Sequence, residues 1–455
     1  MHMFFSKAAP DIAGFLDPTF WTVTVMQLAQ TEPAIRYAAQ AIGAMYASTM
    51  KLAPDSESES DDFTIETYNK AIRALVRRKL NSDHRTIITL TSCVLFICLE
   101  VLRGKIATAI DHIHSGLKLI SEFSTTKNNT GNEPVSAYPT NPSDGSIIDD
   151  LKGMFSRLYL QASLSHCTQG NIWDGPAPYE EPASDSATTF GSLSEARDKL
   201  FSLATECVAI IRPIMHAKYE EKVHFEMIAR QRSLERLLRG WRRTFESSIA
   251  VKVSMSTTRL AAMGNVLSIY AICMHLWVAT SLSVSETTFD QYRHDFETVI
   301  ALAESLLETG DTSEAGFAGA GFQFELGIIP PLQILGAKCR FPDLRQQILD
   351  LLKAAHWREG LFDSARSADF VELMRHIEDA GAVDDATGLP TEAARVHFAN
   401  QFLGPGHDGQ NAAVDMKTVI LLKPEGPYGP WHQLEMGGRC AALGEPHSSS
   451  SVLVA

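Results

Sequence analysis

The apolar positions of this chain recur with the spacing of an α-helix. Within residues 106–120 they lie alternately four and three positions apart, at Ile106, Ile110, Ile113, Leu117 and Ile120. Because an α-helix has 3.6 residues per turn, this spacing puts all five side chains on one face. Residues 68–80, 148–162 and 348–355 repeat the pattern. The sequence therefore predicts helices that each bury one face against a core.

Alternation of polar and apolar positions, which is typical of a half-buried strand, is nearly absent. The exception is residues 416–422, which are followed by a segment rich in proline and glycine. We predict an all-α fold, built as a large bundle or array of stacked antiparallel helical hairpins. A small irregular or β-hairpin tail, with a short strand at residues 416–422, is expected near the C-terminus.

We expect three regions along the chain: an N-terminal extension, one large helical domain and an irregular tail. Their predicted bounds are residues 1–19, 20–395 and 396–455. Helices of about 15 to 25 residues fit between four polar or glycine-rich segments. These segments are the predicted loops, near residues 52–62, 124–146, 172–192 and 310–321.

The composition is that of a folded protein with an acidic surface. Of the 455 residues, 45% are hydrophobic and 21% are charged, so a largely disordered chain is excluded. The formal net charge of -14 repels the phosphate backbone of nucleic acids. Non-specific binding to nucleic acid is therefore not expected.

The seven cysteines lie far apart, and none forms a CxxC pair. This usage is typical of buried thiols in a reducing compartment, and not of a disulfide scaffold or a zinc site. Residues 86–102 and 266–284 are apolar runs that approach the length of a membrane span. In a chain so rich in other helices we interpret both as buried helices. No signal-peptide pattern opens the chain, and we expect an intracellular protein that does not contact a membrane.

Four stretches have the order and spacing found in one protein family: residues 20–36, 68–72, 95–117 and 324–363. The last stretch contains the most specific motifs, which are Phe324-Glu-Leu-Gly-Ile-Ile-Pro-Pro331, Lys338-Cys-Arg340, Pro342-Asp-Leu-Arg345 and Arg358-Glu-Gly-Leu-Phe-Asp363. In these motifs the chain resembles the regulatory (middle homology) region of fungal binuclear zinc-cluster transcription factors. The resemblance implies a helical body that acts in regulation, effector response and partner contact.

The chain departs from that family where the DNA-binding segment is expected. In the family, six cysteines that include two CxxC pairs hold two zinc ions and present a short helix to the major groove. Here 19 residues precede Phe20 and none of them is cysteine. We therefore expect this chain not to bind DNA directly. The alternative is that the cluster is encoded upstream of Met1 and is missing from this sequence.

One predicted helix is strongly basic, because residues 230–243 contain six arginines. In the simpler interpretation its leucines and Trp241 pack inward, and the arginines pair with carboxylates of this acidic chain. In the functional interpretation the arginines form a surface for an acidic partner or for phosphate groups. The candidate basic interaction face consists of Arg232, Arg236, Arg239 and Arg243.

Four charged residues stand among apolar residues of the family-like motifs: Glu100, Arg340, Arg358 and Glu359. Because a buried charge needs a partner, we expect ion pairs that connect helices. The alternative is a polar patch that lines the pocket of a small effector.

The sequence contains no HExxH, GxSxG or GxxxxGK-S/T motif. His112 and His114 are two positions apart, and side chains with this spacing on a helix point in different directions, which does not suit a shared metal ion. We therefore predict no catalytic residue, no metal site and no cofactor.

The sequence as a whole predicts a transcription-regulatory protein of the zinc-cluster type without its own cluster. We expect it in the nucleus (alternatively in the cytoplasm), acting through protein partners or a small-molecule effector, with secondary-metabolite genes as targets. An intact zinc-cluster factor or a second copy of the chain is the expected protein partner. The rival hypothesis is a helical scaffold that binds or transforms an apolar metabolite. That activity would require a pocket of the order of several hundred Å³ with convergent polar groups.

Overall fold

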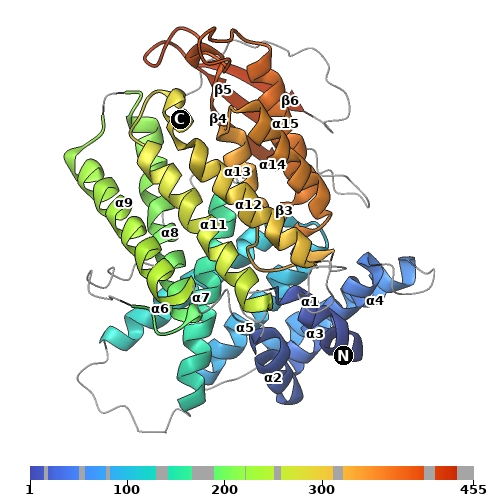
Figure 1. Cartoon of the computed structure of the whole chain (residues 1–455). Helices are drawn as coiled ribbons and strands as arrows, with labels where there is room; N and C mark the ends of the chain where they lie inside the picture. Colours follow the sequence, from blue (N-terminus) through green and yellow to red (C-terminus); the bar gives the residue numbers. More distant parts are fainter. Residues whose placement is uncertain are drawn as a thin grey trace. The chain divides into compact units, whose positions relative to one another are not determined.

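The computed structural model of the chain describes residues 1–14, 19–50, 57–77, 82–129, 142–165, 189–220, 222–250, 258–310, 321–403 and 416–437. Its internal contacts divide the chain into two compact units. Unit 1 consists of Met1–Gln161, Thr309–Gly327 and Trp357–Leu361, and unit 2 consists of Ala162–Glu308, Ile328–His356 and Phe362–Ala455. Helices make up most of both units, which confirms the predicted all-α class (Figure 1).

Unit 1 contains the first helices of the chain. In chain order they are η1 (Phe4–Ala8), α1 (Ala9–Ile12), η2 (Phe20–Thr24), α2 (Val25–Thr31), α3 (Pro33–Thr49), α4 (Glu57–Val76), α5 (Ser82–Leu102), α6 (Ile106–Asn129) and α7 (Pro142–Leu164), whose last turn enters unit 2. Helix α3 packs against both α4 and α5, and α5 packs against α6.

The turn between α5 and α6 shows why these helices form an antiparallel hairpin. Gly104 ends α5 with a φ of 72°, a conformation that glycine adopts without strain. The N–H of Lys105 then donates to the carbonyl oxygen of Glu100 at 2.8 Å, as in a Schellman cap. The chain reverses within three residues, so the apolar stripe of α6 meets α5.

Two short strands bring distant segments into unit 1. Strand β1 (Phe322–Gln323) pairs in parallel with β2 (Arg358–Glu359), with Phe322 opposite Arg358. The N–H of Phe324 also donates to the carbonyl oxygen of Ile12 at 3.0 Å. These backbone bonds attach the C-terminal family-like motifs to the first helices of the chain.

Unit 2 contains the remaining helices. They are α8 (Leu193–Ala217), α9 (Phe225–Phe245), η3 (Glu246–Ala250), α11 (Thr258–Thr280), η4 (Glu286–Tyr292), α12 (Arg293–Gly310), α13 (Ile329–Lys338), α14 (Pro342–Ala355), α15 (Ser364–Asp379) and η5 (Glu392–Ala394), with the two-residue strand β3 (Phe362–Asp363) before α15. Helices α8, α9 and α11 lie side by side, and α13 packs against both α14 and α15 (Figure 1).

A three-stranded antiparallel sheet ends the described part of unit 2. Its strands are β4 (Val396–Leu403), β5 (Met416–Leu422) and β6 (His432–Gly437), with β5 in the centre. Strand β5 spans the residues for which the sequence predicts a strand. The sheet packs Ile420 and Leu422 against Phe370 and Met374 of α15, so the sheet and this helix share one hydrophobic cluster.

The helices extend into some of the predicted loops. Helix α4 begins at Glu57, α6 continues to Asn129 and α7 begins at Pro142. The rest of the predicted loops at 52–62, 124–146 and 172–192 lies largely outside the described residues, as do residues 311–320. The loop bounds predicted from the sequence thus differ from the helix ends of the structure by a few residues.

Helices α5 and α11 are long and apolar enough to cross a membrane. In Arg85–Leu102, however, 83% of the positions are buried inside the structure, and in Arg259–Thr280 the share is 72%. Core helices of a folded protein pass the same test of length and composition. The two runs noticed in the sequence thus form the interior of the helical units.

Candidate functional site

The motif that begins at Phe324 forms a buried cluster in unit 1. The rings of Trp21 and Phe324 meet edge to face with their centroids 5.1 Å apart. Next to them, Arg157 donates two hydrogen bonds to Glu325, at 2.9 and 3.0 Å, and both side chains are at most 3% exposed. Gln161 donates to the carbonyl oxygen of Phe324 at 2.9 Å. The motif therefore connects α7 to the strand β1 and to the N-terminal helices.

Glu359, one of the four predicted polar residues, is fully buried beside the same motif. Its carboxylate accepts hydrogen bonds from the N–H of Gly327 at 3.1 Å and from Nε1 of Trp357 at 2.9 Å. A Cβ on Gly327 would lie 2.3 Å from Oε1 of Glu359, so no larger residue fits there without a shift. The N–H of Arg358, its neighbour in β2, donates to the carbonyl oxygen of Gly321 at 3.1 Å.

Glu100 takes a local partner. Its carboxylate forms an ion pair with Arg103, one turn further along the chain, at 3.2 Å. Close by, the hydroxyl of Tyr68 and Nε2 of His112 lie 3.3 Å apart and share a hydrogen bond. Burial lowers the pKa of His112, because the charged ring loses its hydration.

Arg340 lies in unit 2, at the centre of a buried network of charges. Its guanidinium donates to Glu378 at 2.8 Å and contacts Glu286 at 3.3 Å. Lys338 contacts Glu286 at 2.7 Å, and Arg345 contacts Glu378 at 2.7 Å. Glu286 lies in η4, Lys338 at the end of α13, Arg345 in α14 and Glu378 in α15. Arg340 lies between α13 and α14, so the network ties four elements together.

The network also holds the first residue of β4. The N–H of Val396 donates to Glu378 at 2.9 Å, and the carbonyl oxygen of Val396 accepts from Arg340 at 3.0 Å. Lys338 donates to the carbonyl oxygen of His397 at 2.8 Å. The C-terminal sheet is therefore attached to the helices through buried charges.

The electrostatics favour the charged forms of the acidic partners. Burial acts to raise the pKa of Glu286, but the charges of Lys338 and Arg340 outweigh it and lower this pKa to about 2. The pKa of Glu378 is lowered in the same way, against burial, by Arg340 and Arg345. Buried charges are tolerated only when they are paired and hydrogen-bonded, and this network meets that condition.

The structure thus separates the four predicted residues. Arg340 belongs to unit 2, whereas Glu100, Arg358 and Glu359 belong to unit 1. Glu100 and Arg340 make ion pairs, the first within one helix turn and the second between elements. None of the four is among the described residues that line the cavity of unit 2.

Sequence analysis missed most partners in these networks. Arg157 and Glu325 are 168 positions apart, and Arg340 and Glu286 are 54 positions apart. Charged residues inside apolar helices, such as Arg157 between Phe155 and Leu158, were the available signal. It indicates that a partner is needed, but not which residue provides it.

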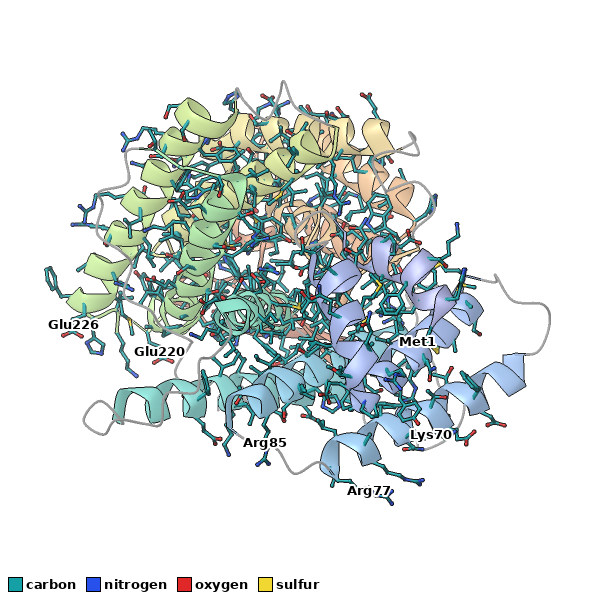
Figure 2. All side chains as sticks on the ribbon, turned by 90° about the horizontal axis from the view of Figure 1, so that it is seen from below. Met1, Lys70, Arg77, Arg85, Glu220 and Glu226 are labelled. Atoms are coloured by element: carbon teal, nitrogen blue, oxygen red, sulfur yellow. The ribbon has the colours of Figure 1, made fainter. Side chains whose placement is uncertain are left out.

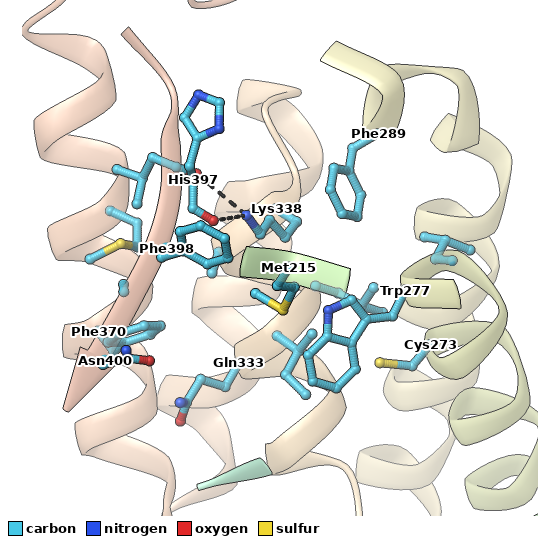
Figure 3. A pocket seen from close by; sticks show the side chains of 17 residues that line it. Met215, Cys273, Trp277, Phe289, Gln333, Lys338, Phe370, His397, Phe398 and Asn400 are labelled. Carbon is cyan, nitrogen blue, oxygen red and sulfur yellow. Dashed lines mark hydrogen bonds between the residues drawn. The ribbon is translucent and has the colours of Figure 1, made fainter. Parts of the chain in front are cut away.

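A partly open cavity of about 70 Å³ lies in unit 2. Figure 3 shows Met215, Cys273, Trp277 and Phe289 on its wall, with β4 on the other side. A volume of this size holds roughly five water molecules. The wall is mostly apolar and fits a small apolar group.

Two polar side chains at this cavity, Lys338 and Gln333, are already engaged by neighbours. The ammonium group of Lys338 contacts Glu286 and the backbone of β4, as the dashed lines in Figure 3 mark for the backbone. Gln333 accepts a hydrogen bond from Ser367 at 2.6 Å. Few polar groups are therefore left to orient a bound molecule. The lining residues that the structure describes do not include a set of convergent catalytic groups.

The basic helix is α9, and the structure divides its arginines into two sets. Arg230 pairs with Glu206, Arg239 with Glu235, and Arg242 with Glu246 and Asp295. The second set, Arg232, Arg236 and Arg243, is exposed and lies on the same helix face as Arg239. Ion pairs with acidic residues of the same chain thus neutralise part of the positive charge of α9.

Metal-binding chemistry has no support in the described residues, where no three His, Cys, Asp or Glu side chains are grouped to hold an ion. Cys93, Cys98, Cys207, Cys273 and Cys339 are free and buried. Burial raises the pKa of the Cys273 thiol to about 12, so this group stays protonated and unreactive.

The described fold is mainly helical, and its most specific sequence motifs form buried ion pairs and hydrogen bonds inside the two units. The profile of the fungal-specific transcription factor domain matches residues 1–375, most of the chain. The chain therefore belongs to the family of fungal-specific transcription factor domains, as the motifs in its sequence indicate, and it is a transcription regulator.

One relative is the aspercryptin biosynthesis cluster-specific transcription regulator atnN of Emericella nidulans. It is 21% identical to this chain over 467 aligned positions, which cover 83% of this chain and 74% of the relative. No solved structure matches the chain.

Proposed function

We propose that this chain regulates the transcription of a biosynthetic gene cluster from within the nucleus, by contact with another protein. The observation that carries the proposal is the family match over residues 1–375. The similarity to a regulator named for a biosynthesis cluster supports the choice of target genes.

The interior of unit 2 favours regulation over chemistry on a bound metabolite. Pockets that enclose a drug-sized molecule have volumes of about 300–1,000 Å³. The cavity beside β4 has a volume of about 70 Å³, and its Lys338 and Gln333 are held by other side chains. A small apolar effector that seats one group in this cavity is compatible with the regulatory function.

The test is deletion of the gene in its native fungus, followed by measurement of transcripts across the genome. We expect the transcripts of one contiguous set of biosynthetic genes to change, while genes outside that set do not. A fluorescent fusion of the chain is expected in the nucleus. If the transcripts of every biosynthetic cluster are unaffected under producing conditions, the proposed target genes are wrong.

A second arm tests contact with protein partners. The chain is fused to a heterologous DNA-binding domain and placed upstream of a reporter gene, so that the result does not depend on how the natural protein reaches DNA. We expect the reporter to respond in the fusion and not with the DNA-binding domain alone. A silent reporter, with the fusion protein folded and nuclear, would reject regulation through partners.

A further inference from the structure

We infer that the exposed face of α9 is a docking surface for an acidic segment of a protein partner. This surface consists of Phe225, Ala229, Arg232, Arg236, Arg239 and Arg243, and is called the arginine face below. The proposed function requires a protein partner, and this inference states which chemistry that partner has. It therefore rests on the proposed function.

The arginine face is defined by helix geometry. Its residues are spaced by four, three, four, three and four positions, so they lie within one narrow stripe of an α-helix. The opposite side of α9 buries Gln231, Leu234, Leu238, Trp241 and Phe245. Trp241 donates from Nε1 to the carbonyl oxygen of Ala196 at 2.9 Å, which fixes α9 on α8 and orients the stripe outward.

Three of its guanidinium groups form no ion pair with any residue that the structure describes. Among the described residues, none lies within ion-pair distance of Arg232, Arg236 or Arg243, whereas Arg242 on the side of the helix contacts Asp295 at 3.4 Å. Glu235 and Glu246, the acidic residues nearest to these three arginines in the sequence, pair with Arg239 and Arg242. The stripe therefore carries net positive charge on a chain whose net charge is -14.

An aromatic side chain stands at one end of the stripe. Phe225 begins α9 and is 80% exposed, the highest exposure among the large hydrophobic residues described. Its neighbour Glu226 projects from the free end of the helix (Figure 2). An exposed aromatic beside a row of arginines matches the usual composition of a protein interface, in which aromatic and arginine residues provide the anchors.

The dimensions fit a peptide segment. From Phe225 to Arg243 the helix rises about 27 Å, which equals the length of about eight residues of extended chain or about 18 residues of helix. Guanidinium groups bind carboxylates through two parallel hydrogen bonds, so glutamate and aspartate side chains are suitable partners. An apolar residue of the segment would contact Phe225.

A duplex nucleic acid suits the surface less well. Three unpaired arginines are few against the charge of the whole chain, which repels phosphates beyond the immediate contact. Phe225 would also remain exposed beside a phosphate backbone, because the phosphates offer no apolar contact to its ring. Charge complementarity together with the aromatic anchor favours an acidic protein segment.

The test is binding of a fluorescein-labelled synthetic peptide with about six carboxylates and one aromatic residue, followed by fluorescence anisotropy. The double variant R232E/R236E of the full chain is expected to weaken binding by about tenfold or more. F225S is expected to weaken it as well. Binding should also fall as salt concentration rises, because the contact is ionic and exposed.

The matched control is R73E/R77E, with Arg73 in the last turn of α4 and Arg77 directly after this helix. These two arginines have the same spacing as Arg232 and Arg236 and are also exposed, and Arg77 projects outward in Figure 2. The control changes the net charge equally, so it should leave peptide binding within about twofold of the unmodified chain. Circular dichroism of each variant confirms that the helices remain folded.

Three results would overturn the inference. They are equal binding by R232E/R236E and the unmodified chain, equal loss in R232E/R236E and the control, or tighter binding of a labelled DNA duplex than of the peptide through the same arginines. The transcript experiment above uses the unmodified gene. A peptide that fails to bind while the transcripts still respond to deletion therefore rejects the docking surface and leaves the proposed function intact.

Discussion

Arg340 and Glu378 form an ion pair that solvent does not reach: Nη2 of Arg340 lies 2.8 Å from Oε1 of Glu378, and both side chains are 0% exposed. The pair links the short segment between α13 and α14 to the last turn of α15. Through the N–H of Val396, the same carboxylate also fixes the start of β4. This pair is therefore one of the connections between the helices of unit 2 and its sheet, beside the apolar contacts of Ile420 and Leu422 with α15.

Replacement of Arg340 by methionine should destabilise the protein strongly. The variant leaves Glu378 and Glu286 buried with fewer cations, and the loss of one partner of a buried pair costs about 3–5 kcal/mol. Urea denaturation followed by tryptophan fluorescence measures the loss. R375M is the control, because the Arg375–Glu372 pair is 29% and 42% exposed and should contribute less than about 1 kcal/mol. A loss below that of R375M would show that the network is not structural.

Acid should weaken the fold through His397. Its ring is 0% exposed and shares a 2.7 Å hydrogen bond with the hydroxyl of Tyr219. Burial lowers the pKa of His397 to about 4, although the charge of Glu286 opposes the shift. Between the ordinary pKa of 6.5 and this value, the unfolded chain binds a proton that the folded chain does not, so stability falls as pH falls.

The measurement is the free energy of unfolding at about pH 7 and about pH 5, where this group contributes a loss of about 2 kcal/mol. In H397Q, which lacks the titrating ring, the decrease should be smaller by about that amount. The other titrating groups are common to both proteins, so the difference reports the His397 ring together with its coupling to Glu286. Identical pH dependence in the two would mean that His397 is protonated as easily in the folded state as in the unfolded state.

Two glycines should respond to alanine in opposite ways. At Gly327 the new Cβ would lie 2.3 Å from Oε1 of the buried Glu359, so G327A should cost about 1–3 kcal/mol. At Gly240, in the middle of α9, nothing lies within 4 Å of the added atom. G240A should therefore stabilise the helix by about 0.5–1 kcal/mol, because glycine loses more conformational entropy than alanine. Thermal denaturation by circular dichroism tests both signs.

The buried pair of unit 1 should show strong coupling. In a double-mutant cycle with R157M and E325Q, the coupling free energy is expected to be about 2–3 kcal/mol, because both side chains are at most 3% exposed. A second cycle on Arg293 and Asp343, which are 45% and 52% exposed, should give less than about 1 kcal/mol. Equal coupling in the two cycles would contradict the role of burial.

The helices could be predicted from sequence because their information is local. The stripe from Ile106 to Ile120 sets the buried face of α6 whatever it packs against. Strand β5 was visible as residues 416–422, but its partners β4 and β6 were not. Strand β4 reads Val-His-Phe-Ala-Asn-Gln-Phe-Leu, and its pairing with β5 depends on a register that the pattern does not specify.

The partners of the charged residues could not be predicted in the same way. Arg340 was identified as a residue that needs a buried partner, and Glu378 was not, although both belong to one ion pair. The two lie 38 positions apart on different helices, so no spacing rule connects them. The arginine face of α9 shows the opposite case, because the four arginines share one helix and their alignment follows from periodicity alone.

The buried charges of unit 2 also set an order of events during synthesis. Glu286 leaves the ribosome 109 positions before Arg395, and the guanidinium of Arg395 donates to the carbonyl oxygen of Glu286. The family match ends at residue 375, before Glu378 is synthesised. Until then Arg340 and Arg345 lack the carboxylate of Glu378, so the nascent helices would expose these cations to water instead of burying them. A polypeptide that stops at residue 375 should accordingly be a substrate for chaperones and proteases. Unit 2 would complete its folding only after the strands β4, β5 and β6 have been synthesised.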